Sequence, residues 1–224
     1  MQFLKVEDWK PGAQALAGRL TKELKAGQSV LWFVPGGSNV HAATGIMARL
    51  SEKLTENLTI MLTDERYGTP GHKDSNYQQL HDAGFDRKQA TFLPTLVEGL
   101  NLQETINHHE DLVGRALAHA TIIIGQFGIG ADGHIAGILP HSSASTSSRL
   151  VAGYEAPPYR RVTLTFEALA QISAAFALVF GKDKQRTLER LQSEELALQE
   201  QPSQILRHLP EAYIYNDQLG RETA

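Results

Sequence analysis

The sequence predicts an α/β fold in which a mostly parallel sheet is covered by helices on both faces. Two observations lead to this prediction. Short, mostly apolar runs of the kind that form buried strands alternate along the 224-residue chain with longer amphipathic segments. The amphipathic segments carry apolar residues at helical spacing. No internal repeat or domain boundary is visible, so we expect a single domain over residues 1–224.

The expected strands and helices follow one another in a regular order. In the first helix Leu16, Leu20 and Leu24 recur at a spacing that places them on one helix face. Strands are expected at 29–34, 58–62, 121–125, 161–165 and 174–180, and helices at about 8–25, 40–53, 104–119 and 182–198. Two long polar segments, 63–79 and 140–158, interrupt the order and are expected to be functional loops.

Composition excludes several classes of function. The chain has no cysteine, which excludes disulfides, thiolate nucleophiles and cysteine metal sites. Its net charge is −4 and it has no long basic run, so we expect no nucleic-acid partner. No apolar stretch is long enough to cross a membrane, and residues 1–10 do not resemble a secretion signal. We therefore expect a cytoplasmic protein.

The segment after the first strand, residues 34–39 (VPGGSN), is suited to bind an anion. Ligands of open α/β sheets bind beyond the carboxyl ends of the strands. Gly36 and Gly37 let the backbone approach a ligand, and the N–H groups of the next helix favour negative charge. Ser38 or Asn39 is expected to cap that helix or to bond a phosphate oxygen. An ordinary strand-to-helix turn is the alternative interpretation.

Charged residues also follow two other strands. Asp64-Glu65-Arg66 comes directly after the second strand, where Arg66 suits an anion or a developing oxyanion because its planar guanidinium makes bidentate contacts. A surface ion pair is the plainer alternative. Lys184 follows the last strongly apolar strand and is expected to be a phosphate counter-charge. For Lys184 the alternative is an exposed first helical turn.

Residues 125–134 (GQFGIGADGH) follow the third strand. Their glycines formally match the G-x-G-x-x-G pattern of dinucleotide-binding loops. We reject that interpretation because Asp132 would place a carboxylate where the pyrophosphate binds. Pro140 and the serines after it also disrupt the helix that must follow.

The same loop is better interpreted as presenting a catalytic pair, His134 and Asp132. An imidazole can take a proton from water, and a nearby carboxylate can orient the ring and stabilise its cation. A buried histidine with a structural role is one alternative, and a metal site completed by His141 is another. The spacing matches no metal-binding motif, so no metal is expected.

Taken together and in order, these motifs resemble those of the 6-phosphogluconolactonase family. This family shares a superfamily with glucosamine-6-phosphate deaminases and ribose-5-phosphate isomerase. The matching segments, within about residues 30–217, are Gly36-Gly37-Ser38, Asp64-Glu65-Arg66 with Asp74-Ser75-Asn76, the 128–134 loop, Arg161–Thr165, and Gly181 with Lys184. The resemblance implies a three-layer α/β/α Rossmann-like fold. It also implies hydrolysis of 6-phosphoglucono-1,5-lactone to 6-phosphogluconate in the pentose phosphate pathway, without metal or organic cofactor.

The resemblance also implies roles for individual residues. His134 would be the general base, Asp132 would orient it, and Arg66 would stabilise negative charge on the intermediate. The expected partner is a phosphorylated sugar lactone, bound by a monomer or small homo-oligomer. Residues expected to bind substrate or its phosphate are Gly36, Gly37, Ser38, Asp64, Arg161 and Lys184.

Some residues depart from the family pattern. Ser38-Asn39-Val40 stands where family members commonly have Ser-Thr-Pro, which leaves the phosphate contacts open. His134-Ile135-Ala136 leans towards the deaminases. However, deaminases place a glutamate where this chain has Leu139, and a tyrosine where it has Arg66. These two differences favour lactone hydrolysis over the alternatives, a deaminase/isomerase-type enzyme and a non-catalytic sugar-phosphate-binding protein.

Overall fold

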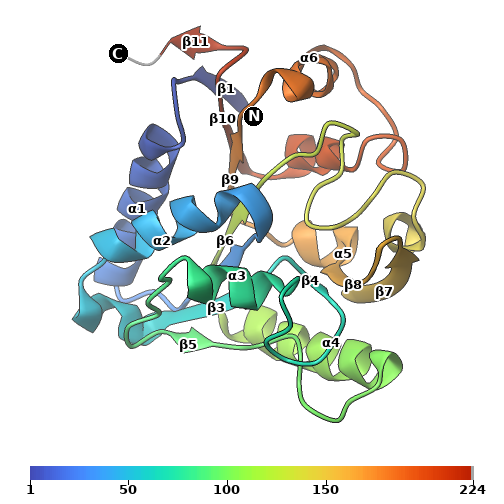
Figure 1. Cartoon of the computed structure of the whole chain (residues 1–224). Helices are drawn as coiled ribbons and strands as arrows, with labels where there is room; N and C mark the ends of the chain where they lie inside the picture. Colours follow the sequence, from blue (N-terminus) through green and yellow to red (C-terminus); the bar gives the residue numbers. More distant parts are fainter. Residues whose placement is uncertain (223–224) are drawn as a thin grey trace.

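A computed structural model describes residues 1–222 and contains one large sheet and one small sheet (Figure 1). The large sheet has eight strands in the order β11-β1-β10-β9-β6-β2-β3-β5, and every neighbouring pair is parallel. The prediction of a mainly parallel sheet is therefore confirmed. The strands are β1 (Gln2–Lys5), β2 (Val30–Val34), β3 (Leu58–Leu62), β5 (Thr91–Phe92), β6 (Ile122–Phe127), β9 (Ala174–Val179), β10 (Glu211–Asn216) and β11 (Arg221–Glu222).

Helices cover both faces of this sheet, which Figure 1 shows nearly edge-on. On β2, Val30, Trp32 and Val34 pack in one apolar cluster with α1 and α2, whereas Leu31 and Phe33 pack in a second cluster with α4. This alternation follows from the two-residue period of a strand. The helices are α1 (Lys10–Lys25), α2 (Val40–Arg49), α3 (Asn76–Asp82), α4 (Leu102–His119), α5 (Phe166–Leu169) and α6 (Gln185–Ser193).

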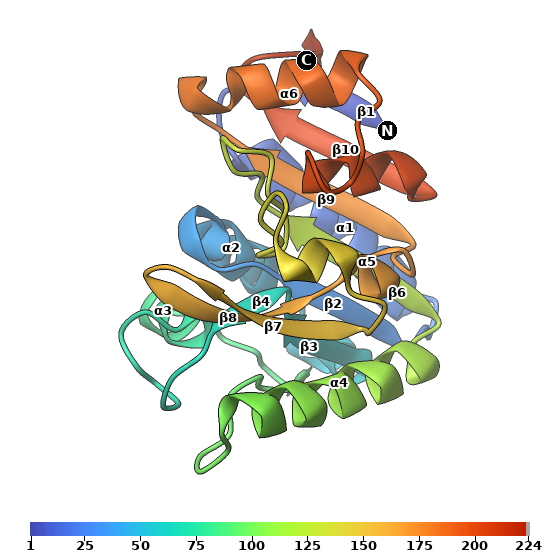
Figure 2. The ribbon, with the colours of Figure 1, turned by 90° about the vertical axis from the view of Figure 1, so that its right-hand side faces the viewer.

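The small sheet is antiparallel, with the order β4 (Asp64–Arg66), β8 (Tyr159–Leu164) and β7 (Val151–Ala156). Figure 2 shows β7 and β8 on the same face of the large sheet as α4. The expectation of uninterrupted loops at 63–79 and 140–158 is wrong, because β4 and β7 lie within them. Both strands are partly polar, as strands of an antiparallel sheet with one face toward solvent usually are.

Helix boundaries also differ from the expected ones. The expected helix at 182–198 is shorter: a 3₁₀ turn, η4 (Lys182–Lys184), leads into α6, which ends at Ser193. The expected helix at 40–53 ends at Arg49 and follows another 3₁₀ turn, η1 (Gly37–Asn39). Further 3₁₀ turns are η2 (Glu52–Asn57), η3 (Ser143–Thr146) and η5 (Pro202–His208). Within residues 1–222, no helix has both the length and the apolar character needed to cross a bilayer.

Candidate active site

A cavity of about 290 Å³ lies at the carboxyl edge of the large sheet. The segments that follow β2, β3, β6 and β9 form its walls. These four strands are neighbours and parallel, so their carboxyl ends meet at one edge. The cavity is lined by Pro35, Gly36, Gly37, Ser38, Asn39, Thr63, Asp64, Arg66, Asn76, Gly128, Ile129, Gly130, His134, Ala136, Gly137, Arg161 and Lys184.

The cavity brings together eight of the nine residues that the sequence singled out. They are Gly36, Gly37, Ser38, Asp64, Arg66, His134, Arg161 and Lys184. The ninth, Asp132, does not line the cavity but contacts His134. A larger cavity of about 980 Å³, beside β1, has Arg207 and Arg221 in its wall but no histidine or carboxylate, and none of the residues that the sequence singled out.

His134 and Asp132 form a close pair. Nδ1 of the imidazole lies 2.6 Å from Oδ1 of the carboxylate, and the backbone N–H of His134 donates to the same oxygen at 3.1 Å. Burial raises the pKa of Asp132, but its contacts with His134 outweigh that effect and lower the pKa to about 2. The carboxylate is therefore ionised at neutral pH and can only accept, so Nδ1 carries a proton. In the neutral ring Nε2 is then the basic nitrogen.

The glycine-rich loop holds this pair in place. A Cβ at Gly130 would lie 2.1 Å from Nδ1 of His134, so only glycine fits beside the ring. The loop is anchored from outside by Thr187, whose hydroxyl donates to the carbonyl of Ala131 at 2.5 Å, and by Thr163, whose hydroxyl donates to the carbonyl of Ala136. The His134 side chain is 38% exposed, so solvent reaches it and the alternative of a buried structural histidine does not apply.

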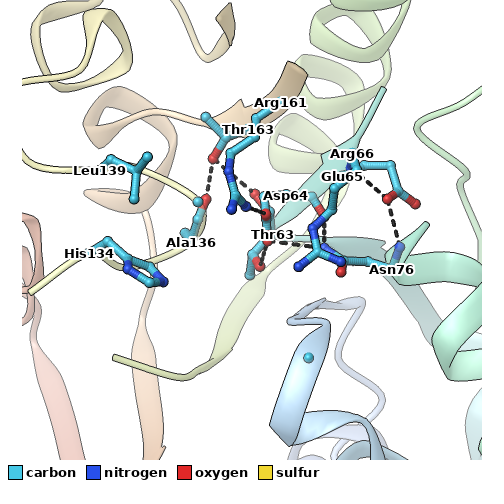
Figure 3. Close-up of polar contacts among 12 residues, drawn as sticks. Thr63, Asp64, Glu65, Arg66, Asn76, His134, Ala136, Leu139, Arg161 and Thr163 are labelled. Atoms are coloured by element: carbon cyan, nitrogen blue, oxygen red, sulfur yellow. Dashed lines mark hydrogen bonds and ion pairs between the residues drawn. The ribbon is translucent and has the colours of Figure 1, made fainter. Parts of the chain in front are cut away.

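Two guanidiniums lie on the opposite wall, on the small sheet (Figure 3). Arg161 of β8 forms an ion pair with Asp64 of β4, with 3.0 Å between Nη1 and Oδ2. Arg66 of β4 instead donates through Nη1 to the carbonyl of Asp74 at 2.9 Å. The ring of Tyr159 lies against both, at 5.2 Å from the Arg66 guanidinium and 5.9 Å from that of Arg161. Asp64 thus pairs with a cation of the protein.

The third wall carries the groups expected to bind phosphate. Gly37 has a positive φ of 64° and, like Ser38, is exposed. Nζ of Lys184 lies 2.7 Å from the carboxylate of Asp183. The expectation that Ser38 or Asn39 caps the following helix is wrong, because η1 intervenes and neither side chain makes a cap hydrogen bond. Asn39 is buried and donates to the carbonyl of Leu178 at 3.3 Å.

Comparison with known proteins identifies the family. A family model described as glucosamine-6-phosphate isomerases/6-phosphogluconolactonase matches residues 9–215. The chain belongs to this family.

Relatives within the family are distant in sequence. A 6-phosphogluconolactonase of Helicobacter pylori strain 26695 is 27% identical over 200 residues, covering 84% of this chain and 86% of that protein. The protein of the same name from strain J99 is 28% identical over 137 residues, a match that covers 58% of this chain and spans only 59% of the relative's length.

Solved structures confirm the α/β fold of the glucosamine-6-phosphate isomerase/6-phosphogluconolactonase family. The crystal structure of a 6-phosphogluconolactonase from Shewanella baltica superposes with a TM-score of 0.80 at 18% identity, covering 96% of this chain and 98% of that one. A monomeric glucosamine-6-phosphate deaminase superposes with a TM-score of 0.78, also at 18% identity, covering 96% and 97%. The fold is thus common to both named activities, and only the site residues can distinguish them.

Three residues near the site received no individual role from the sequence. Asn76 lines the cavity, Tyr159 packs on both arginines, and Glu65 is buried behind β4. The sequence marks these three residues only weakly, because the place of each near the site depends on which segments pair in the fold. As for metals, no group of three or more histidines and carboxylates is arranged to hold an ion among the side chains that the structure describes, those of residues 1–221, and His141 does not line the cavity.

Proposed function

We propose that this protein hydrolyses 6-phosphoglucono-1,5-lactone to 6-phosphogluconate, a reaction of the pentose phosphate pathway. The observation that carries the proposal is the convergence of His134, Arg66 and Lys184 on one cavity. Family membership and relatives named 6-phosphogluconolactonase support it. We further propose that the chain acts in the cytoplasm as a single domain, either as a monomer or as a small homo-oligomer.

In this proposal His134 acts as the general base. Nε2 removes a proton from water while the water oxygen bonds to the lactone carbonyl carbon, giving a tetrahedral oxyanion. The bond between that carbon and the ring oxygen then breaks, and the imidazolium returns its proton to the ring oxygen. Asp132 stabilises the imidazolium between these two steps. A positioned base of this kind contributes about 10²–10⁴-fold to the rate.

Arg66 is the residue best suited to stabilise the oxyanion. Arg161 is already paired with the carboxylate of Asp64, whereas Arg66 forms no ion pair with any residue in the range 1–221. Its guanidinium is therefore not held by a carboxylate partner at the cavity wall. A donor aimed at an oxyanion contributes about 10²–10³-fold. Arg161 and Asp64 are left to bind the hydroxyl groups of the sugar or to hold the wall.

We place the phosphate of the substrate between η1 and Lys184. Gly36 and Gly37 leave the backbone accessible, and Ser38 offers a hydroxyl from an exposed position. The carboxylate partner of Lys184, Asp183, is 63% exposed, so that ion pair is weak and a phosphate dianion competes with it.

A deaminase is the main alternative function. Leu139, at the position where deaminases carry a glutamate, has no group that transfers protons. Arg66 stands where they carry a tyrosine. A binding-only protein is the second alternative. Binding alone does not require a histidine that is oriented by a carboxylate.

The proposal is tested with one preparation of folded protein and two substrates. A coupled assay follows the formation of 6-phosphogluconate from its lactone, against the spontaneous rate, and a second assay follows ammonia release from glucosamine 6-phosphate. We expect acceleration of the first reaction only. Ammonia release without lactone hydrolysis would support the deaminase, and saturable binding in calorimetry with neither reaction would support a binding protein.

A further inference from the structure

Glu65 is a buried acid that the proposed mechanism does not use. Its relative exposure is 0%, and among the residues whose burial the structure describes, 1–221, it is the one Asp, Glu, Lys or Arg that is buried. A carboxylate placed in the interior loses its hydration, which is costly unless hydrogen bonds replace it. Burial raises the pKa of Glu65, and hydrogen bonds from Asn76, Tyr77, Ser75 and Arg66 oppose that effect.

Four donors surround this carboxylate, and none is a charged group. Oε1 accepts from the backbone N–H groups of Arg66 and Asn76, each at 2.7 Å. Oε2 accepts from the hydroxyl of Ser75 at 2.8 Å and from the backbone N–H of Tyr77 at 3.1 Å. Three of these donors belong to Ser75 and the first turn of α3, so the carboxylate of a strand residue holds the start of a helix.

A side chain at the start of α3 also donates a hydrogen bond to the backbone of β4. Nδ2 of Asn76, at the start of α3, donates to the backbone carbonyl of Asp64 on β4 at 2.8 Å (Figure 3). Asn76 is in turn fitted against the phosphate-binding loop, since a Cβ at Gly36 would lie 1.9 Å from its Oδ1. A displacement of α3 would therefore move groups on two walls of the cavity.

The position of Glu65 within β4 links this connection to the site. Successive side chains of a strand point to opposite faces. Asp64 and Arg66 line the cavity, and Glu65 between them does not. Fixing the Glu65 side chain behind the strand thereby fixes the direction in which its two neighbours project.

We propose that Glu65 is a positioning residue, whose buried carboxylate locks β4 to the first turn of α3 and so holds the guanidinium of Arg66 at the cavity wall. This inference rests on the proposed lactone hydrolysis for its kinetic test. The contacts that carry it do not depend on which reaction the site performs.

The test begins with Glu65→Gln, which keeps the size of the side chain but replaces one acceptor oxygen with an NH₂ group that faces N–H and O–H donors. We expect kcat for lactone hydrolysis to fall about tenfold, with a smaller change in KM, because Arg66 acts on the intermediate. The matched control is Glu110→Gln, which removes a carboxylate that accepts from Arg149 and from the backbone of Leu150, none of which lines the cavity. It should leave kcat within about twofold.

A double-mutant cycle separates positioning from general destabilisation. If Glu65 acts through Arg66, Glu65→Gln costs little further activity in an Arg66→Ala background. Equal losses in both backgrounds, or a folded Glu65→Gln protein with wild-type kcat, would overturn the inference. If Glu65→Gln does not fold, Ser75→Ala takes the place of Glu65→Gln in the same cycle, with a smaller loss expected. This substitution removes one donor to the carboxylate together with the helix cap, in which the Ser75 hydroxyl accepts from the backbone N–H of Gln78.

A binding measurement distinguishes failure of the proposed lactone hydrolysis from failure of the proposed positioning role of Glu65. The product 6-phosphogluconate carries a carboxylate at the carbon where the oxyanion forms, so its binding, unlike that of the neutral lactone group, depends on Arg66. Calorimetry with 6-phosphogluconate on the same four proteins should therefore show the same non-additive pattern in Kd, whether or not the wild type turns over the lactone. Absence of turnover with non-additive binding rejects the lactonase function alone. Additive binding losses, or no binding by the wild type, reject the positioning role.

Discussion

Nδ1 of His134 lies 2.6 Å from Oδ1 of Asp132, and the pKa of that carboxyl group is lowered to about 2. The contact sets the tautomer of the imidazole, because an ionised carboxylate can only accept from Nδ1–H. Asp132→Asn presents an amide to the ring in place of the ionised carboxylate and no longer stabilises its cation. We expect kcat to fall by about tenfold, less than the loss of the base itself, with KM nearly unchanged.

Steady-state kinetics of Asp132→Asn on the phosphorylated lactone checks this prediction. Asp183→Asn is a suitable control, since Asp183 is also an exposed acid but contacts Lys184 instead of the imidazole. Wild-type kcat in Asp132→Asn would show that the pair has no part in the reaction.

Lys184→Ala should raise KM for the phosphorylated lactone by about tenfold and leave kcat within about twofold, because a phosphate contact is made equally in the ground and transition states. Lys182→Ala removes an exposed lysine of the same turn that does not line the cavity, and it should have little effect. The measurement is KM for both variants. Equal changes in KM for the two variants would show that Lys184 does not bind the phosphate.

Gly36→Ala should damage both stability and binding, although the backbone conformation there suits alanine. The new Cβ would lie 1.9 Å from Oδ1 of the buried Asn76. We expect a loss of about 1–3 kcal/mol in the free energy of unfolding, together with a raised KM. In contrast, Gly18 lies in α1 with open space around its Cα, so Gly18→Ala should stabilise the protein by about 0.5–1 kcal/mol. Urea denaturation compares the two, and an undamaged Gly36→Ala protein would mean that the loop is not fitted against Asn76.

Stability should depend on pH through His109 of α4, a buried histidine outside the site. Burial, aided by the charge of His108, lowers the pKa of His109 from 6.5 to about 4. The unfolded chain therefore takes up this proton at a higher pH than the folded one. The contribution of His109 to stability is complete above pH 6.5 and decreases as the pH falls towards 4, with about 2 kcal/mol lost between pH 7.5 and pH 5.

His109→Gln should remove this part of the pH dependence. Denaturant unfolding at pH 7.5 and pH 5 measures the difference in free energy for the wild type, for the variant and for His119→Gln, which alters an exposed histidine of the same helix. The difference should shrink in His109→Gln alone. An unchanged difference would show that His109 is not kept neutral by burial.

The central strands were predictable because strands covered on both faces are almost wholly apolar, as β2 and β3 are. β10 was missed because its sequence, EAYIYN, mixes polar and apolar residues, and β5 and β11 are only two residues long. β4 and β7 resemble loops in sequence because their polar residues belong to a small sheet whose existence depends on a distant strand, β8.

The site was more predictable than the small sheet, since one rule about the carboxyl ends of parallel strands gathers His134, Arg66 and Lys184 without knowledge of their contacts. The same rule does not predict which side chains at this edge contact one another. It did not indicate that Asp64 pairs with Arg161, or that Glu65 holds α3. Those relationships depend on how β4 and β8 align and on where α3 begins, and both are set by tertiary packing.

We propose that His134, oriented by Asp132, activates water against a phosphorylated lactone bound in this cavity. The most direct test is kcat/KM for hydrolysis of 6-phosphoglucono-1,5-lactone by the wild type and by His134→Ala, each corrected for the spontaneous reaction and each shown to be folded by circular dichroism. We expect clear acceleration by the wild type and a loss of about 10²–10⁴-fold in the variant. No acceleration by the folded wild type would reject lactone hydrolysis by this protein, and equal rates for the two proteins would show that His134 is not the general base.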